Sequence, residues 1–261
     1  MPHVSSLGNY NPVVSVYPDA KVASIDIAQR IASLIRSNHQ SGKQTVLGLA
    51  TGSTPIYVYE ELVRLHREEH LRFKDVVSFN LDEYFPMQPD SPHSYVAFMQ
   101  KHLFDHVDIN PDNVYIPDGT HPRESIEDYC RTYEQKIGDL GGIDIQLLGI
   151  GRTGHIGFNE PGAEFDSQTR LVELNDLTRT DAAAGFGEKE QVPTEAITMG
   201  IDTILKARKI ILMAWGKGKA AIIKKMMESD LTPDIPATFL KTCERVELVL
   251  DTEAASDLRK E

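Results

Sequence analysis

Cysteine is scarce in this chain: only two of its 261 residues are cysteine, Cys130 and Cys243. Neither has the CxxC or Cys/His spacing of a metal site. Both are expected to be reduced thiols, because disulfides are rare in reducing compartments. The N-terminus lacks a basic start followed by an apolar core, so we expect no signal peptide. No apolar run approaches the roughly 20 residues that span a bilayer. These absences favour a cytoplasmic protein over a secreted or membrane protein.

Positive charge is also in short supply. The chain has 27 Lys and Arg residues against 39 Asp and Glu residues, which gives a formal net charge of −12. This balance argues against nucleic acid or an anionic membrane as a partner, since both need a basic face. It is compatible with a small anionic substrate, because a few cationic side chains and backbone amides can form one positive pocket. The rest of the composition, 41% hydrophobic and 25% charged, is ordinary for a globular protein.

Apolar runs typical of buried strands alternate with segments of helical spacing along most of the chain. We expect strands at residues 45–50, 76–81, 143–150, 210–215 and 246–250, and helices at 22–37, 55–69, 94–104, 125–137, 194–205 and 219–228. Residues 1–18 are expected to form an irregular lead-in. The alternation predicts an α/β protein with a single doubly wound, mostly parallel, Rossmann-like sheet flanked by helices. We expect one domain over residues 1–261, with a lid within the long, weakly periodic segment 161–193.

The loops after the first two expected strands carry candidate binding and catalytic groups. Residues 50–55 read ATGSTP and precede a helix, so free backbone N–H groups, the helix dipole and hydroxyls favour a phosphate there. Plain capping by Ser53 or Thr54 is the alternative. After the next strand come Asp82 and Glu83, where a carboxylate can act as a general base. A helix-initiating acidic pair or a solvated turn is the alternative for these two residues.

The most informative loop, residues 151–161, follows the third expected strand and carries His155 and Glu160. Histidine can gain or lose a proton near neutral pH, and a nearby carboxylate can orient it and raise its basicity. The glycines of this loop permit tight turns or close approach to a ligand. Two surface polar residues on a turning loop are the alternative interpretation of the pair.

A fourth loop, residues 215–220, places Lys217 and Lys219 beside a helix N-terminus. The helix dipole disfavours cations there unless an anion lies between them, and a pair of solvated lysines is the alternative. Because the carboxyl ends of parallel strands share one edge, all four loops are expected to converge. His102 and His106, four residues apart, raise the alternative of a metal site. No third ligand with matching spacing is evident, so we expect no metal.

Six motifs in order make the chain resemble glucosamine-6-phosphate deaminases, also called glucosamine-6-phosphate isomerases, over about residues 20–252. The matching segments are LGLATGSTP (47–55), FNLDEY (79–84), SYVAFMQKHLFDHVDI (94–109), GIG…GHIGFNEPG (149–162), VP…AITMGIDTIL (192–205) and GKGKA (216–220). The resemblance implies that glucosamine 6-phosphate and water give fructose 6-phosphate and ammonia, in amino-sugar catabolism. It implies an aldose–ketose isomerisation coupled to loss of the amine, without metal or organic cofactor.

The resemblance also implies roles for matched residues. Asp82 resembles the base that moves a proton between carbons 2 and 1 of the sugar. His155 resembles the acid/base that opens the sugar ring, and Glu160 resembles its carboxylate partner. The phosphate-binding positions of the family are matched by Gly52, Ser53, Thr54 and Lys219. Binding of the phosphate can position the reacting end of the sugar, which is remote from it.

Two matched positions near the expected site differ from the family pattern. Thr153 stands where well-studied bacterial deaminases carry an aspartate two residues before the histidine. The imidazolium of His155 is therefore expected to be less stabilised, unless Glu160 or another acid compensates. An arginine of the cover region, which contacts the substrate phosphate in such enzymes, aligns with Ala184. Arg152 is our candidate for supplying that missing positive charge.

A third difference concerns regulation. A lysine of the family's activator site aligns with Val172, although Arg170 is retained, so activation of the usual kind is not expected. Two other functions stay open: a non-catalytic sugar-phosphate sensor, which Thr153 favours, and a 6-phosphogluconolactonase-like hydrolase, which the FNEP sequence of residues 158–161 disfavours. The chain is expected to bind a small phosphosugar, and the sequence is compatible with a homo-oligomer.

Overall fold

The computed structural model describes residues 10–258, which form two sheets. The larger sheet has the strand order β1-β10-β9-β6-β2-β3-β5, and each neighbouring pair is parallel. Its strands are β1 (Val13–Tyr17), β2 (Thr45–Leu49), β3 (Val76–Asn80), β5 (Val114–Tyr115), β6 (Ile145–Leu148), β9 (Lys209–Ala214) and β10 (Val246–Asp251). The prediction of a mostly parallel sheet is confirmed.

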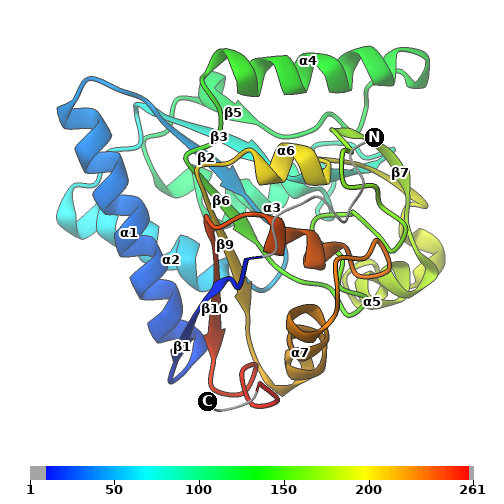
Figure 1. Cartoon of the computed structure of the whole chain (residues 1–261). Coiled ribbons are helices and arrows are strands. Elements are labelled where there is room, and N and C mark those ends of the chain that lie inside the picture. The colour runs from blue at the N-terminus through cyan, green and yellow to red at the C-terminus, as the bar shows by residue number, and fades with distance from the viewer. Residues whose placement is uncertain (1–9, 259–261) are drawn as a thin grey trace.

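Helices cover both faces of this sheet, which accounts for its continuous apolar strands (Figure 1). Side chains of β9 alternate between the two layers of the core: Ile211 and Met213 face one layer, and Ile210 and Leu212 face the other. The first layer is built with α1 (Ala20–Gln40), α2 (Ile56–Glu69) and α3 (Tyr95–His102), and the second with α4 (Ile126–Asp139), α6 (Ile201–Leu205) and α7 (Ala220–Glu228). The sheet is therefore doubly wound, as expected from the alternating pattern.

A smaller antiparallel sheet lies beyond the predicted architecture. It consists of β4 (Asp82–Phe85), β8 (Glu195–Thr198) and β7 (Arg170–Glu173), with β8 in the middle. The expectation of a helix over residues 194–205 is wrong for its first half, because β8 pairs with strands on both sides. Only after Gly200, the N-cap, does the chain turn into α6. Tertiary pairing overrides the local helical pattern here.

One other expectation needs correction. The lead-in is not irregular throughout, because residues 13–17 form β1, an edge strand with exposed side chains at Val13 and Val16; residues 1–9 lie outside the described part. The segment 161–193, within which a lid is expected, contains β7 and the helix α5 (Asp176–Phe186). Most of the other predicted elements are present, with ends that differ by up to three residues.

The order of the strands creates a crevice. From β2 the chain moves outward to β3 and β5, and then returns to the other side of β2 with β6, β9 and β10. The direction of winding therefore reverses between β2 and β6, and the loops that leave these two strands diverge. Open α/β sheets bind ligands at such a switch point, outside the carboxyl ends of the strands.

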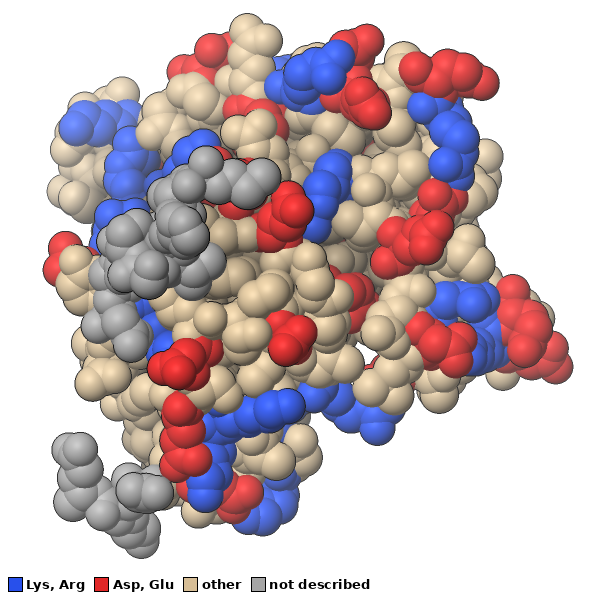
Figure 2. Space-filling model, turned by 45° about the vertical axis from the view of Figure 1, so that its right-hand side comes forward, with Lys and Arg blue, Asp and Glu red and all other residues tan. Residues whose placement is uncertain are grey.

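The distribution of charge on the surface agrees with the low content of Lys and Arg. On the face in Figure 2, acidic and basic side chains are interspersed rather than gathered into one basic area. Among the described residues, no helix is both long and apolar enough to cross a bilayer.

Candidate active site

A cavity of about 290 Å³ lies at the switch point. The loops that follow β2, β3, β6 and β9 all contribute to it, so four separated segments of the sequence meet there. The residues from these loops that line it include residues 50–54, Asp82, residues 149–152, His155 and Lys219. One further wall comes from α5, through Thr178, Asp181 and Ala182.

The loop after β2 presents hydroxyls and a helix N-terminus to this cavity. Gly52 has a φ of +83°, a left-handed conformation that other residues rarely adopt. Pro55 is the N-cap of α2, and no side chain caps the helix. The alternative that Ser53 or Thr54 serves as the cap is therefore wrong. Their hydroxyls and the first N–H groups of α2 are available to an anion.

Asp82 begins β4, immediately beyond the carboxyl end of β3, rather than a solvated turn. Its side chain is only 6% exposed. Burial, and then the charge of neighbouring Glu83, raises the pKa of Asp82 to about 8. Gly157 lets the next loop pass close by, since a Cβ there would lie 3.2 Å from Asp82 Oδ2. A carboxylate in this setting is a stronger base than one in water.

Glu83 has a different function from its neighbour. Its carboxylate accepts backbone hydrogen bonds from Tyr84 N at 2.9 Å, Tyr95 N at 2.8 Å and Val96 N at 3.3 Å. Burial raises the pKa of Glu83 to about 7, although these three donors oppose the shift. Glu83 therefore fixes β4 to the N-terminus of α3, while Asp82 is left facing the cavity.

His155 lies against the backbone of its own loop. Its Nδ1 is 2.9 Å from Thr153 Oγ1 and 3.3 Å from Glu160 Oε2. Within the described part of the chain, Nε2 has no protein partner, and the ring lines the cavity. Gly151 makes this placement feasible, because a Cβ at that position would lie 2.0 Å from the imidazole Nε2. The glycine is required here for close approach of the catalytic candidate.

Glu160 lies behind His155 rather than in the cavity wall. Burial raises the pKa of Glu160, but its contacts with His155, and then with the Thr178 hydroxyl and the Asn175 N–H, outweigh burial and hold the pKa below its ordinary value. Glu160 is therefore charged at neutral pH and pairs with the imidazole. Thr153 adds a hydrogen bond to the same nitrogen but no charge.

The two lysines of the fourth loop, Lys217 and Lys219, have different surroundings. Lys219 reaches the cavity and donates from Nζ to Ile150 O at 2.7 Å. Burial lowers the pKa of Lys219, which an anion beside it would reverse. Lys217 instead binds Ser256 Oγ at 2.7 Å and Asp257 Oδ1 at 2.8 Å, so its interpretation as a second anion ligand is wrong.

Arg152 lines the cavity but is already paired. Its Nε donates to Asp181 Oδ2 at 2.9 Å, and its Nη2 donates to the other oxygen of the same carboxylate. Arg152 can therefore reach a phosphate only by giving up, or sharing, Asp181. Ala184 lies on the exposed side of α5 and leaves this position without charge.

Sequence reasoning missed the structural role of Asn159, which shapes the site. Asn159 is fully buried, donates to Ile156 O and Met199 O, and accepts from Arg170 Nη1 at 3.0 Å. It thereby ties the His155 loop to the small sheet. Its place in the FNEP motif marked it as matched to the family, but its partners lie too far along the chain for a pattern to indicate them.

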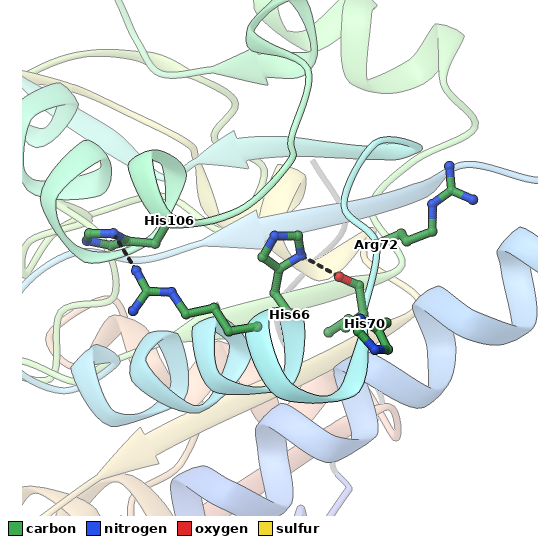
Figure 3. Close-up of a pocket in the computed structure, with 6 residues that line it drawn as sticks. His66, His70, Arg72 and His106 are labelled. Carbon is green, nitrogen blue, oxygen red and sulfur yellow. Dashed lines mark hydrogen bonds between the residues drawn. The ribbon is translucent and has the colours of Figure 1, made fainter.

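A second hollow, of about 540 Å³, lies at the C-terminal end of α2, where the chain leads into the amino end of β3 (Figure 3). His66 Nδ1 donates to Leu71 O at 2.6 Å. His106 is held on both sides, since Nδ1 accepts from Arg67 and Nε2 donates to Lys101 O. Basic side chains are favoured by the dipole at a helix C-terminus, which accounts for this group. Among residues 10–258, no cluster of three or more His, Cys, Asp or Glu is arranged to hold a metal.

The fold and this site define a class: α/β proteins with a polar cavity at the switch point of a doubly wound sheet. Residues 18–249 match the model of the family described as glucosamine-6-phosphate isomerases/6-phosphogluconolactonase, and the chain belongs to this family. It is 46% identical to a glucosamine-6-phosphate deaminase of Bacillus pumilus over 230 residues, 88% of this chain and 95% of that protein.

Two further similar proteins support the same family assignment. A solved monomeric glucosamine-6-phosphate deaminase has a TM-score of 0.89 and 42% identity, with 94% of this chain and 99% of that one covered. A glucosamine-6-phosphate deaminase-like protein of Bacteroides thetaiotaomicron is 43% identical over 245 residues. That match covers 94% of this chain but only 37% of the Bacteroides protein, so the present chain corresponds to one part of it.

Proposed function

We propose that this protein converts glucosamine 6-phosphate and water to fructose 6-phosphate and ammonia, as a cytoplasmic enzyme of amino-sugar catabolism. One observation carries the proposal: Asp82, His155 with Glu160 behind it, Lys219 and the loop before α2 meet at one cavity. The 46% identity to a protein named glucosamine-6-phosphate deaminase supports the same reaction. The uncharged Thr153 favours the sensor alternative, but Glu160 supplies a carboxylate to the same imidazole nitrogen of His155. The FNEP sequence of residues 158–161 disfavours the lactonase alternative.

The phosphate end of the substrate binds at the N-terminus of α2. Gly52, Ser53 and Thr54 supply backbone and hydroxyl donors, and Lys219, which lines the same cavity, supplies a positive charge. Arg152 adds a second charge once the phosphate competes with Asp181 for its guanidinium. Binding energy gained here holds the reacting carbons in place.

His155 opens the sugar ring. Because Nδ1 faces Thr153 and Glu160, Nε2 is the nitrogen that exchanges a proton with the ring oxygen and the hydroxyl on C1. The negative charge of Glu160 stabilises the imidazolium while that proton is held.

Asp82 then takes the proton from C2 of the open-chain aldehyde and returns it to C1. The oxygen on C1 gains a proton as the enolamine forms, and the nitrogen on C2 gives up a proton as the enolamine becomes an imine, so the aminoaldehyde and the imine are isomers. Water adds to the imine, ammonia leaves, and fructose 6-phosphate remains. One carboxylate suffices, because C1 and C2 are adjacent and the same oxygen can reach both. The segment 161–193 acts as a lid through α5, which covers this chemistry from one side.

The first test is to incubate the protein with glucosamine 6-phosphate and to measure fructose 6-phosphate and ammonia together. Equal release of both establishes the reaction. Saturable binding of the sugar phosphate without turnover would identify a sensor. Turnover of 6-phosphogluconolactone in place of the amino sugar would identify a lactonase.

The rate should depend on pH through Asp82. The base must be ionised before it can take a proton, and its pKa in the free enzyme is about 8. We expect kcat/KM to rise about tenfold per pH unit towards about pH 8 and then to level off. A profile that is flat between about pH 6 and about pH 8 would contradict this assignment.

Gly151→Ala is expected to lower kcat about 100-fold while the fold is kept, because the new Cβ displaces the His155 ring. The control is Gly138→Ala, since a Cβ at Gly138 in α4 would meet nothing within 4 Å. Steady-state kinetics and circular dichroism on both variants provide the comparison. Equal activity of the two would show that His155 tolerates displacement and is not the ring-opening group.

A further inference from the structure

Two buried polar groups beside the candidate acid/base pair lack hydrogen bonds of ordinary geometry. They are the carboxylate of Glu160, which within residues 10–258 forms an ion pair with His155 alone, and the hydroxyl of Thr178. Thr178 is 7% exposed and comes from the first turn of α5. Buried polar groups almost always have hydrogen-bond partners, so two neighbouring groups without ordinary hydrogen bonds need a physical explanation.

The two groups are complementary. A carboxylate can only accept hydrogen bonds, and a threonine hydroxyl can donate one. Besides His155, the groups that favour the charged form of Glu160 are the Thr178 hydroxyl and the Asn175 N–H. Asn175 is also the N-cap of α5, where its side chain accepts from Leu177 N at 2.8 Å. Glu160 therefore faces the positive end of the α5 dipole, which favours its negative charge.

We propose that Thr178 is a positioning residue: its hydroxyl donates to the Glu160 carboxylate, which in turn orients the imidazole of His155. The inference rests on the proposed function. In this arrangement α5 does more than line the cavity. One series of hydrogen bonds, from Thr178 to Glu160 to His155, links the position of this helix to the orientation of the acid/base. Thr153 carries no charge, so Glu160 is the carboxylate on which His155 depends.

The arrangement has a consequence for movement of the lid. The same helix also contributes Asp181, which pairs with Arg152 on the His155 loop. Two side chains of α5 thus contact the two ends of the 152–160 segment, Thr178 at Glu160 and Asp181 at Arg152. When α5 is displaced, Glu160 loses its donor and Arg152 loses its carboxylate together. The acid/base pair is fully assembled only with α5 in place.

The test uses three variants. Thr178→Val keeps the branched shape and removes the hydroxyl, and Thr178→Ser keeps the hydroxyl. Thr180→Val makes the same chemical change on the exposed side of α5, where the Thr180 hydroxyl only bonds Asp176 O at 2.7 Å. The first readout is independent of activity: the pKa of Glu160 is measured by NMR on the full chain with ¹³C-labelled glutamate, and the signal is assigned with Glu160→Gln.

Loss of a donor to a charged carboxylate destabilises the ionised form. We therefore expect Thr178→Val to raise the pKa of Glu160 by about one, and the other two variants to leave it unchanged. His155 is the titratable side chain that interacts with Glu160, so the same series in a His155→Gln background isolates the effect of Thr178. An unchanged Glu160 pKa in Thr178→Val would overturn the proposal, as would an equal rise in Thr180→Val.

The second readout is turnover of glucosamine 6-phosphate at about pH 8. Thr178→Val should lower kcat about tenfold and leave KM within about threefold, while Thr178→Ser stays near the wild type. A rise in KM alone would overturn the positioning role and assign Thr178 to substrate binding. If the wild type does not turn over this sugar while the Glu160 pKa responds as expected, the proposed reaction fails but the contact between Thr178 and Glu160 stands.

Discussion

Asp82→Asn is expected to lower kcat for glucosamine 6-phosphate by about 10²–10⁴-fold, with substrate affinity kept within about threefold. The amide has the shape of the carboxylate but cannot accept the proton from C2. The proposed phosphate-binding groups, Ser53 and Lys219, lie on other loops and are untouched by the change. Initial rates of fructose 6-phosphate formation give kcat, and calorimetric titration with the substrate gives the affinity.

The matched control is Asp105→Asn. Asp105 is exposed in a short helical turn, Phe104–His106, and forms no ion pair in the structure of residues 10–258. It should behave as the wild type in both measurements. Retention of turnover in Asp82→Asn would mean that another group removes the C2 proton, and the mechanism given above would be wrong. A large loss of affinity in the same variant would place Asp82 in substrate binding instead.

Alternation of strands and helices was enough to predict the main sheet, because strands buried on both faces are continuous apolar runs such as Val46–Leu49 in β2. It also indicated where chemistry would gather, since parallel strands end at one edge. This rule alone predicts that Asp82, His155 and Lys219 lie close together, whatever their roles. The resemblance to a known family then added roles that residue types alone could not assign.

The small sheet could not be predicted in the same way. Residues 195–198 follow a helical pattern locally, and they become a strand only because β4 and β7 lie on either side. The pairing of Arg152 with Asp181, 29 residues away, depends on the seating of α5 and leaves no periodic signal. Lys217 and Lys219 are indistinguishable as neighbours in sequence, yet only Lys219 reaches the cavity. Contacts between side chains on different elements are set by packing rather than by local pattern.

The buried carboxylate of Asp82, which is the proposed base, should weaken the fold at high pH. Asp82 titrates near pH 8 in the native protein and near its ordinary value of 3.8 when unfolded. Between those two values the native state holds a proton that the unfolded state has lost, so stability falls as pH rises from about 4 to about 8. Above about pH 8 Asp82 is ionised in both states, and the free energy of unfolding falls no further. The total loss of stability is then several kcal/mol.

Asp82→Asn removes this titration, so its stability relative to the wild type should increase with pH. We expect the difference in Tm between variant and wild type to grow by about 5–10 °C between about pH 5 and about pH 9. Thermal melts followed by circular dichroism at several pH values provide the measurement. An effect of the amide that is the same at every pH drops out when the Tm differences at two pH values are compared. A difference that does not change with pH would show that Asp82 ionises normally in the native protein. An increase, together with loss of turnover, would show that the energy stored by burying this carboxylate is the source of its basicity.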